Sequence, residues 1–248
     1  MGRRPMMNKK WKSFQKLTEK CYENMIGAEE DVSCWQNGFE LLKELVLEER
    51  KRDPQFAPEL ELLDDATDYR FDIEGWLEDC LDEMDMREDH AVLLRMCDDL
   101  LKLFTWSEYT GSDLKFRKVG ALNALGKVQK AAEFCDKWIE KESENIVAAT
   151  AGVYAYMKNS EQNKARELIE TFIPDGMICC DDNDIMFTAA SRFYEKVGDT
   201  KKHKQMEEAL EAYDQELEAY FSEYDDMDED EDDLSAIDPY TAVNALLF

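Results

Sequence analysis

Apolar residues recur at steps of three and four along nearly the whole 248-residue chain, and this pattern constrains the fold more than any other feature. One run begins after Asn8, a candidate N-cap, and stops at Gly27; the next ends near Asp53-Pro54. No segment shows the sustained two-residue alternation of a half-buried strand. Gly and Pro are scarce, at 10 and 5 residues, which disfavours a turn-rich sandwich or barrel. We therefore predict an all-α protein.

The first 105 residues contain four such runs, which predict an N-terminal set of helical pairs over residues 1–105. Each run places its apolar residues on one face of a helix, the pattern of a helix with one buried side. These apolar positions are Trp11, Phe14, Leu17, Cys21, Tyr22 and Met25; Val32, Trp35, Phe39, Leu42, Leu45 and Val46; Tyr69, Ile73, Trp76, Leu77, Cys80, Leu81 and Met84; and Ala91, Leu94, Cys97, Leu100, Leu101 and Phe104.

The second half of the chain contains a repeat. An offset of 34 residues pairs Trp138 with Phe172, and a further offset of 38 pairs Phe172 with Leu210. Each unit predicts two antiparallel helices. The predicted turns are Gly126-Lys127, Asn159-Ser160 and Gly198-Asp199. Because one helical pair cannot bury both of its apolar faces, neighbouring pairs are expected to stack.

This period and pattern resemble the tetratricopeptide repeat family over about residues 112–221. The small residue that opens the second helix in that family is matched by Ala131 and Ala165, and its turn glycine by Gly126 and Gly198. Each of these two positions departs from the family pattern in one of the three units, and the family's early tryptophan is absent from all three. The resemblance implies antiparallel helical pairs stacked as a right-handed solenoid. An unrelated α-solenoid of similar period is the alternative.

The second helix of the third unit is expected to continue as a capping helix, since its apolar spacing persists to Tyr224. Residues 222–236 then predict a solvated acidic linker, because nine of the eleven residues from 223 to 233 are acidic. Residues 237–248 are apolar again and predict a short peptide. This peptide either docks on its own solenoid, or on that of a neighbouring copy, and competes with a partner, or it forms a disordered tail.

Charge limits the partners of the chain. It contains 58 acidic and 30 basic side chains, a formal net charge of −28, which excludes generic DNA or RNA binding and disfavours an anionic membrane surface. The uncharged runs are too short for a membrane span, which needs about twenty residues. The seven cysteines have no regular spacing and mostly occupy apolar helical positions, as buried thiols do in a reducing compartment. We predict a cytoplasmic protein.

No residues suggest catalysis or metal binding. The chain has only two histidines, and His203 with Glu207 gives two potential metal ligands without a third. The carboxylates that follow Cys179-Cys180 should raise the pKa of a neighbouring thiol, so we expect a linker with one cysteine under a helix. We therefore predict a non-enzymatic protein with no catalytic residue, metal or cofactor.

The resemblance also implies a ligand groove lined by the first helix of each pair. Carrying the family's groove positions onto this chain gives a set that mixes aromatic, amide and cationic side chains. The partner-binding residues predicted in this way are Phe116, Asn123, Thr150, Tyr154, Met157, Thr188 and Arg192, with Gly120 and Glu195 on the same face. The set lacks the ordered Lys, Asn and Arg residues with which some family members hold a terminal carboxylate.

The function that the sequence favours is a protein-interaction scaffold that binds a protein segment in a concave helical groove. The alternative is an acidic decoy or inhibitor that occupies the basic nucleic-acid-binding site of a partner protein, which the net charge favours. The partner is a protein in both cases and a basic one in the second. The sequence leaves its identity, and the oligomeric state, open.

Overall fold

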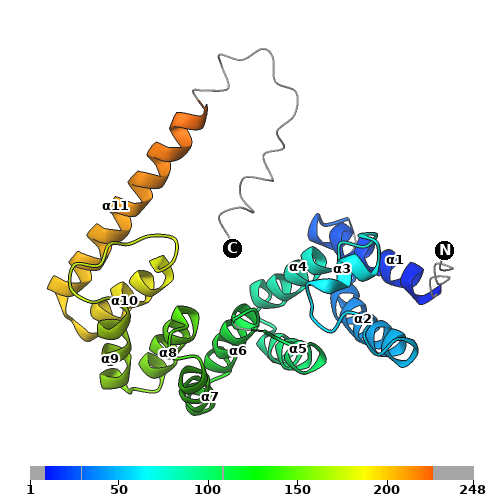
Figure 1. Cartoon of the computed structure of the whole chain (residues 1–248), viewed down its shortest axis with the longest axis horizontal. Coiled ribbons are helices and arrows are strands. Elements are labelled where there is room, and N and C mark those ends of the chain that lie inside the picture. The colour runs from blue at the N-terminus through cyan, green and yellow to red at the C-terminus, as the bar shows by residue number, and fades with distance from the viewer. Residues whose placement is uncertain (1–8, 29, 108, 226–248) are drawn as a thin grey trace. The chain divides into compact units, whose positions relative to one another are not determined.

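A computed structural model describes residues 9–28, 30–107 and 109–225. Within these ranges the regular secondary structure is entirely helical, as the sequence predicts (Figure 1). The helices are α1 Lys9–Met25, α2 Ser33–Arg52, α3 Leu62–Ala66, α4 Ile73–Met86, α5 His90–Leu103, α6 Ser112–Ala124, α7 Val128–Lys141, α8 Ile146–Lys158, α9 Gln162–Phe172, α10 Asp184–Val197 and α11 Thr200–Asp225. Contacts divide the chain into two compact units, residues 1–172 and 173–248.

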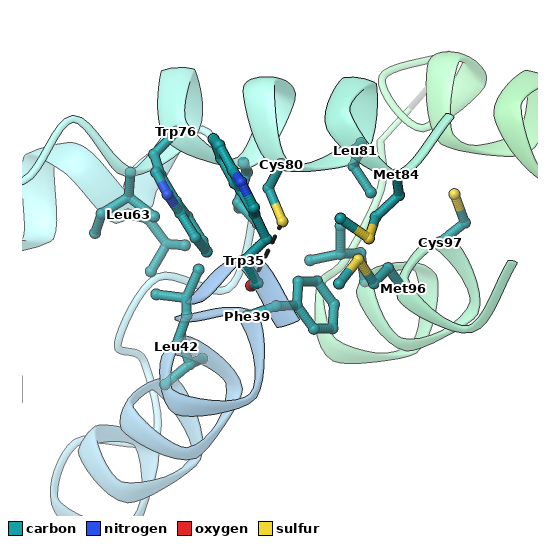
Figure 2. Packing of buried hydrophobic residues seen from close by; sticks show 14 of the residues in the cluster. Trp35, Phe39, Leu42, Leu63, Trp76, Cys80, Leu81, Met84, Met96 and Cys97 are labelled. Carbon is teal, nitrogen blue, oxygen red and sulfur yellow. Dashed lines mark hydrogen bonds between the residues drawn. The ribbon is translucent and has the colours of Figure 1, made fainter. Parts of the chain in front are cut away.

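The core of the first helices is built on two parallel tryptophans, Trp35 of α2 and Trp76 of α4. Both side chains are fully buried, and their rings lie 6.3 Å apart with planes 11° from parallel (Figure 2). Phe14 of α1 meets Trp76 edge-on at 5.1 Å. Gly38 of α2 leaves room for this indole, because a Cβ at Gly38 would lie 2.7 Å from Trp76 Cζ2. The apolar faces predicted for these helices thus form a shared core.

Helix α4 begins later than the apolar pattern of its sequence indicates. The prediction that Tyr69 belongs to its buried face is wrong: α4 begins at Ile73, and Tyr69 is 75% exposed with a left-handed φ of 53°. The cause is Asp64 of α3, whose carboxylate accepts hydrogen bonds from the backbone N–H groups of Ile73 (2.7 Å) and Glu74 (3.1 Å). A cap supplied from nine residues upstream fixes where α4 starts.

The last turn of α1 also differs from its predicted pattern. Tyr22 and Met25 are exposed, at 38% and 43%, whereas the polar residue Asn24 is buried. Asn24 Oδ1 accepts hydrogen bonds from Trp35 Nε1 (3.1 Å) and Arg87 Nη2 (2.8 Å). Hydrogen bonds of this kind make it possible to bury a polar side chain. The periodicity of apolar residues could not reveal that Asn24 is buried here while Tyr22 and Met25 are exposed.

The helical pairs predicted from residue 112 onwards are present, with the predicted turns. The first helices α6, α8 and α10 begin at residues 112, 146 and 184, and the second helices α7, α9 and α11 begin at 128, 162 and 200. These spacings reproduce the offsets of 34 and 38 residues. The turn residues Gly126, Ser160 and Gly198 all have left-handed φ angles, of 69°, 63° and 77°.

In the first unit, α6 packs against both α7 and α8, and α8 packs against α9. Trp138 of α7 is 4% exposed and belongs to the core shared by α6, α7 and α8. Helix α5 packs directly on α6, so the predicted boundary between residues 105 and 112 joins two helices of the same compact unit.

Asn145 connects the first two of these pairs through its side-chain amide. Its Oδ1 caps α8 by accepting hydrogen bonds from Val147 N (3.0 Å) and Ala148 N (3.3 Å). Its Nδ2 donates to the hydroxyl of Ser112, the first residue of α6, at 2.8 Å. One buried side chain therefore starts α8 and fixes it to the start of α6.

The second unit contains α10 and α11, preceded by a loop. Asn183 holds this loop in place, since its Oδ1 accepts from Cys180 N (2.9 Å) and its Nδ2 donates to Ile178 O (3.0 Å). Cys179 is buried and Cys180 is exposed, so one cysteine of the pair is buried, as predicted.

Three predictions concern residues outside the described ranges: the cap at Asn8, the part of the acidic linker beyond residue 225, and the peptide 237–248. They stay predictions. Among the helices that the structure describes, none is both long enough and apolar enough to cross a membrane.

Candidate protein-interaction surface

Two of the predicted partner-binding residues, Phe116 of α6 and Tyr154 of α8, come together on the surface of the first unit. Their ring centroids lie 6.2 Å apart with an interplanar angle of 82°, an edge-to-face contact. Both side chains are half-buried. Because α6 and α8 pack side by side, aromatic residues from two successive pairs form one continuous surface.

Asn123 lies two turns beyond Phe116 on α6, Met157 lies one turn beyond Tyr154 on α8, and both are half-buried. Asn123 Oδ1 is buried and has no hydrogen-bond partner among the residues that the structure describes. Gly120, between Phe116 and Asn123 on α6, is exposed, and a Cβ there would meet no atom within 4 Å. We call Phe116, Gly120, Asn123, Tyr154 and Met157 the α6–α8 face.

Thr150 differs from the other predicted residues of α8. It is 1% exposed, and its hydroxyl donates a hydrogen bond to Ile146 O at 2.8 Å. A side chain in this position lies beneath the α6–α8 face and is not accessible to a partner. Thr150 lies one turn before Tyr154 on α8, but the packing of neighbouring helices on α8 buries it.

Thr188 and Arg192 belong to the second unit, where they lie one turn apart on α10. Thr188 is half-buried and lines an open hollow of about 540 Å³ between α10 and α11, together with Leu210 and Tyr213. Arg192 is exposed. These two residues therefore form a candidate surface of their own within the second unit.

The basic side chains next to the α6–α8 face are paired with carboxylates. Helix α6 carries the run Lys115-Phe116-Arg117-Lys118, which in isolation would suggest affinity for an anion. The ion pairs are Lys115–Glu142 (2.5 Å), Arg117–Asp113 (2.7 Å) and Lys118–Asp98 (2.6 Å). Their positive charges are therefore compensated, and the aromatic and amide groups dominate the chemistry of the face. Sequence reasoning missed these pairs.

One contact in the second unit resembles a nucleophile–base pair and was not predicted. Ser191 Oγ lies 3.1 Å from His203 Nδ1 and donates a hydrogen bond to the Glu207 carboxylate. The same Nδ1 lies 3.1 Å from the backbone carbonyl oxygen of Ser191, an acceptor to which the ring nitrogen must donate. The tautomer with the proton on Nδ1 is the one that satisfies this carbonyl, and in that tautomer Nδ1 cannot accept the hydroxyl proton. Ser191 is also 4% exposed. The contact is therefore a structural one, which joins α10 to α11 through hydrogen bonds.

The buried thiols are poorly suited to reactivity. Burial raises the pKa of Cys80, Cys97 and Cys135 to about 12, and that of Cys179 to about 11. A thiol with such a pKa carries almost no thiolate at neutral pH. In the described part of the chain, no group of three or more His, Cys, Asp or Glu residues could hold a metal ion.

Comparison with models of protein families, with curated proteins and with solved structures finds no match for this chain.

Proposed function

We propose that the protein is a non-enzymatic, cytoplasmic scaffold that binds a protein segment across the α6–α8 face. The proposal includes a tetratricopeptide-like stack of helical pairs, with the first helix of each pair on the concave side. The observation that carries it is the partly exposed pair of Phe116 and Tyr154, with a buried Asn123 oxygen that has no described partner two turns further along α6.

The chemistry of this face suits a bound peptide. A buried acceptor without a hydrogen bond costs about 1–3 kcal/mol, and rotation of the half-buried Asn123 amide towards the surface would let a backbone N–H of a bound segment satisfy it. Phe116 and Tyr154 offer rigid contact area, so little side-chain entropy is lost on binding. The exposed Gly120 lets a bound backbone approach α6 closely, because no side chain projects from that position.

The partner should be identified first, by affinity capture of the full-length chain from its native cell and mass spectrometry. Affinity for that partner is then measured for Tyr154→Ala, Asn123→Ala and Arg192→Ala. We expect Tyr154→Ala to weaken binding by about tenfold or more, as truncation of a buried interface aromatic does. Tyr69→Ala is the matched control, because Tyr69 is 75% exposed in a loop of the same unit.

Each variant must retain the helicity and melting temperature of the native protein. If Tyr154→Ala and Asn123→Ala bind the partner as well as Tyr69→Ala does, the α6–α8 face is not the binding site. An effect confined to Arg192→Ala would move the site to α10.

The second candidate function is the acidic decoy, which the net charge of −28 supports. The pairing of the basic run on α6 with carboxylates also favours it, since no uncompensated cation from that run opposes a basic partner. A decoy would lose affinity steeply with added salt and would be displaced by the partner's nucleic acid. Salt-tolerant binding that Tyr154→Ala abolishes would favour the scaffold.

A further inference from the structure

Helix α11 is 26 residues long, nearly twice the length of α10, which has 14 (Figure 1). Its first half packs on α10 and the preceding loop. Lys202 Nζ lies 5.0 Å from the centre of the Tyr194 ring, and the Tyr213 hydroxyl donates a hydrogen bond to Asp181. Beyond Tyr213 the helix continues for three more turns.

These last turns carry a partly exposed apolar stripe. Leu217 is half-buried, Tyr220 is 46% exposed and Phe221 is 61% exposed. The rings of Tyr220 and Phe221 meet edge-on at 5.7 Å. A shallow hollow of about 510 Å³ beside them is lined by residues of α11 alone, among them Leu217 and Phe221. Spacing of three and four residues places Leu217, Tyr220 and Phe221 on one face, as in helices that pair with another helix.

The charges around the stripe are uniformly negative. Asp214, Glu216 and Glu218 border it, and Lys204 is the last Lys or Arg of the printed sequence. Residues 205–233 contain fifteen carboxylates. The carboxylates in the last turns of α11 oppose the helix dipole, because negative charge at the C-terminal end of a helix repels its partial negative charge. A cation brought to this end would reduce the repulsion among the carboxylates and the repulsion between the carboxylates and the helix dipole.

We propose that Leu217, Tyr220 and Phe221, with their acidic border, form a docking site for a basic amphipathic helix of another protein. Apolar residues of that helix would cover the stripe, and its Lys or Arg residues would face Asp214, Glu216 and Glu218. A second copy of this chain would bring like charges together. The chain's own residues 237–248 contain no Lys or Arg and cannot neutralise the border. This site lies on α11 and does not depend on the α6–α8 face.

The test uses the full-length chain and a synthetic amphipathic helical peptide of about 18 residues, with Leu on one face and Lys on the other. Binding is followed by fluorescence anisotropy of the labelled peptide. We expect Leu217→Ser/Phe221→Ser to weaken binding by about tenfold or more, since two apolar contacts are lost. Leu47→Ser is the matched control and should change affinity by less than about twofold, as surface sites do. Leu47 is 50% exposed on α2.

A second pair of variants separates local from general charge. Glu216→Gln/Glu218→Gln should weaken binding and its salt dependence more than Glu140→Gln/Glu144→Gln, which removes the same charge from exposed positions near the end of α7. Circular dichroism confirms that each variant keeps its helices.

Three results would overturn the proposal. Equal effects of the two glutamine pairs would show only general attraction between the peptide and an acidic protein. Equal effects of the Leu217/Phe221 and Leu47 variants would show that the stripe is not the contact. Tighter peptide binding after deletion of residues 237–248 would make that segment the occupant of the stripe.

Discussion

Replacing Gly38 with alanine tests the packing of α2 against α4. A Cβ at Gly38 would lie 2.7 Å from Trp76 Cζ2 and 2.9 Å from Cη2. Because carbon atoms in contact prefer about 3.5–4.0 Å, the indole would have to move by about 1 Å. Trp76 is fully buried between Phe14 and Trp35, so the ring has no free space beside it.

The expected size of the effect follows from two opposing contributions. Alanine is favoured over glycine in a helix interior by about 1 kcal/mol. Forcing extra volume into a packed core costs about 1–3 kcal/mol. We expect Gly38→Ala to lower the free energy of unfolding by about 1–2 kcal/mol, with overpacking at the upper end of its range because Trp76 is packed on both sides.

Gly120→Ala is the matched control, since it makes the same change in α6 where no atom lies within 4 Å of the new Cβ. It should raise the free energy of unfolding by up to about 1 kcal/mol. Urea unfolding followed by tryptophan fluorescence suits both variants, because all five tryptophans lie within residues 1–172. The substitution Trp76→Phe should remove most of the penalty of Gly38→Ala, giving a coupling energy of about 1 kcal/mol or more. Equal stabilisation by both alanine variants would refute the close contact of Gly38 with Trp76.

Three further predictions concern other parts of the molecule. Trp138→Ala should lower the free energy of unfolding by about 3–5 kcal/mol in the same urea assay, and a loss below about 0.5 kcal/mol would mean that the repeat register is wrong. Burial raises the pKa of Glu142, but hydrogen bonds from Lys115, Trp138 and Asn145 outweigh it and lower the pKa. A lowered pKa stabilises the fold above the pKa of the unfolded chain, about 4.3, and this stability is lost as the pH falls through the folded value. Thermal melting between about pH 5 and 3 should therefore decline less steeply in Glu142→Gln than in the native chain; parallel curves would contradict this. Native protein treated with iodoacetamide should gain one adduct, at Cys180, as measured by mass spectrometry, because the other six cysteines are buried; rapid labelling of further sites would contradict their burial.

The helices and turns of residues 112–225 could be predicted because their signals are local. The turn residues Gly126 and Gly198 and the burial of Trp138 all follow from apolar spacing within one or two neighbouring helices. Features that depend on partners far along the chain could not be predicted. Asp64 caps α4 from nine residues away, and Arg117 pairs with Asp82 across 35 residues.

Depth within the candidate site was equally hidden. The resemblance gave Thr150 and Tyr154 the same status, yet Thr150 is buried and Tyr154 is partly exposed. The packing of neighbouring helices on α8 decides this difference, and no single helix encodes it. One signal for the loop contacts was available in the sequence. Asn145 and Asn183 stand at equivalent positions, 38 residues apart, immediately before α8 and α10.

The link from Asn145 to Ser112 has a consequence for the order in which a growing chain assembles. At about 5–20 residues per second, residue 145 is synthesised about 2–7 s after residue 112. During that interval α6 and α7 can pack together, but the hydroxyl of Ser112 lacks its amide partner from Asn145. The side chain that completes the start of α6 also begins α8. The α8–α9 pair is therefore added in register with the α6–α7 pair before it, in the direction of translation.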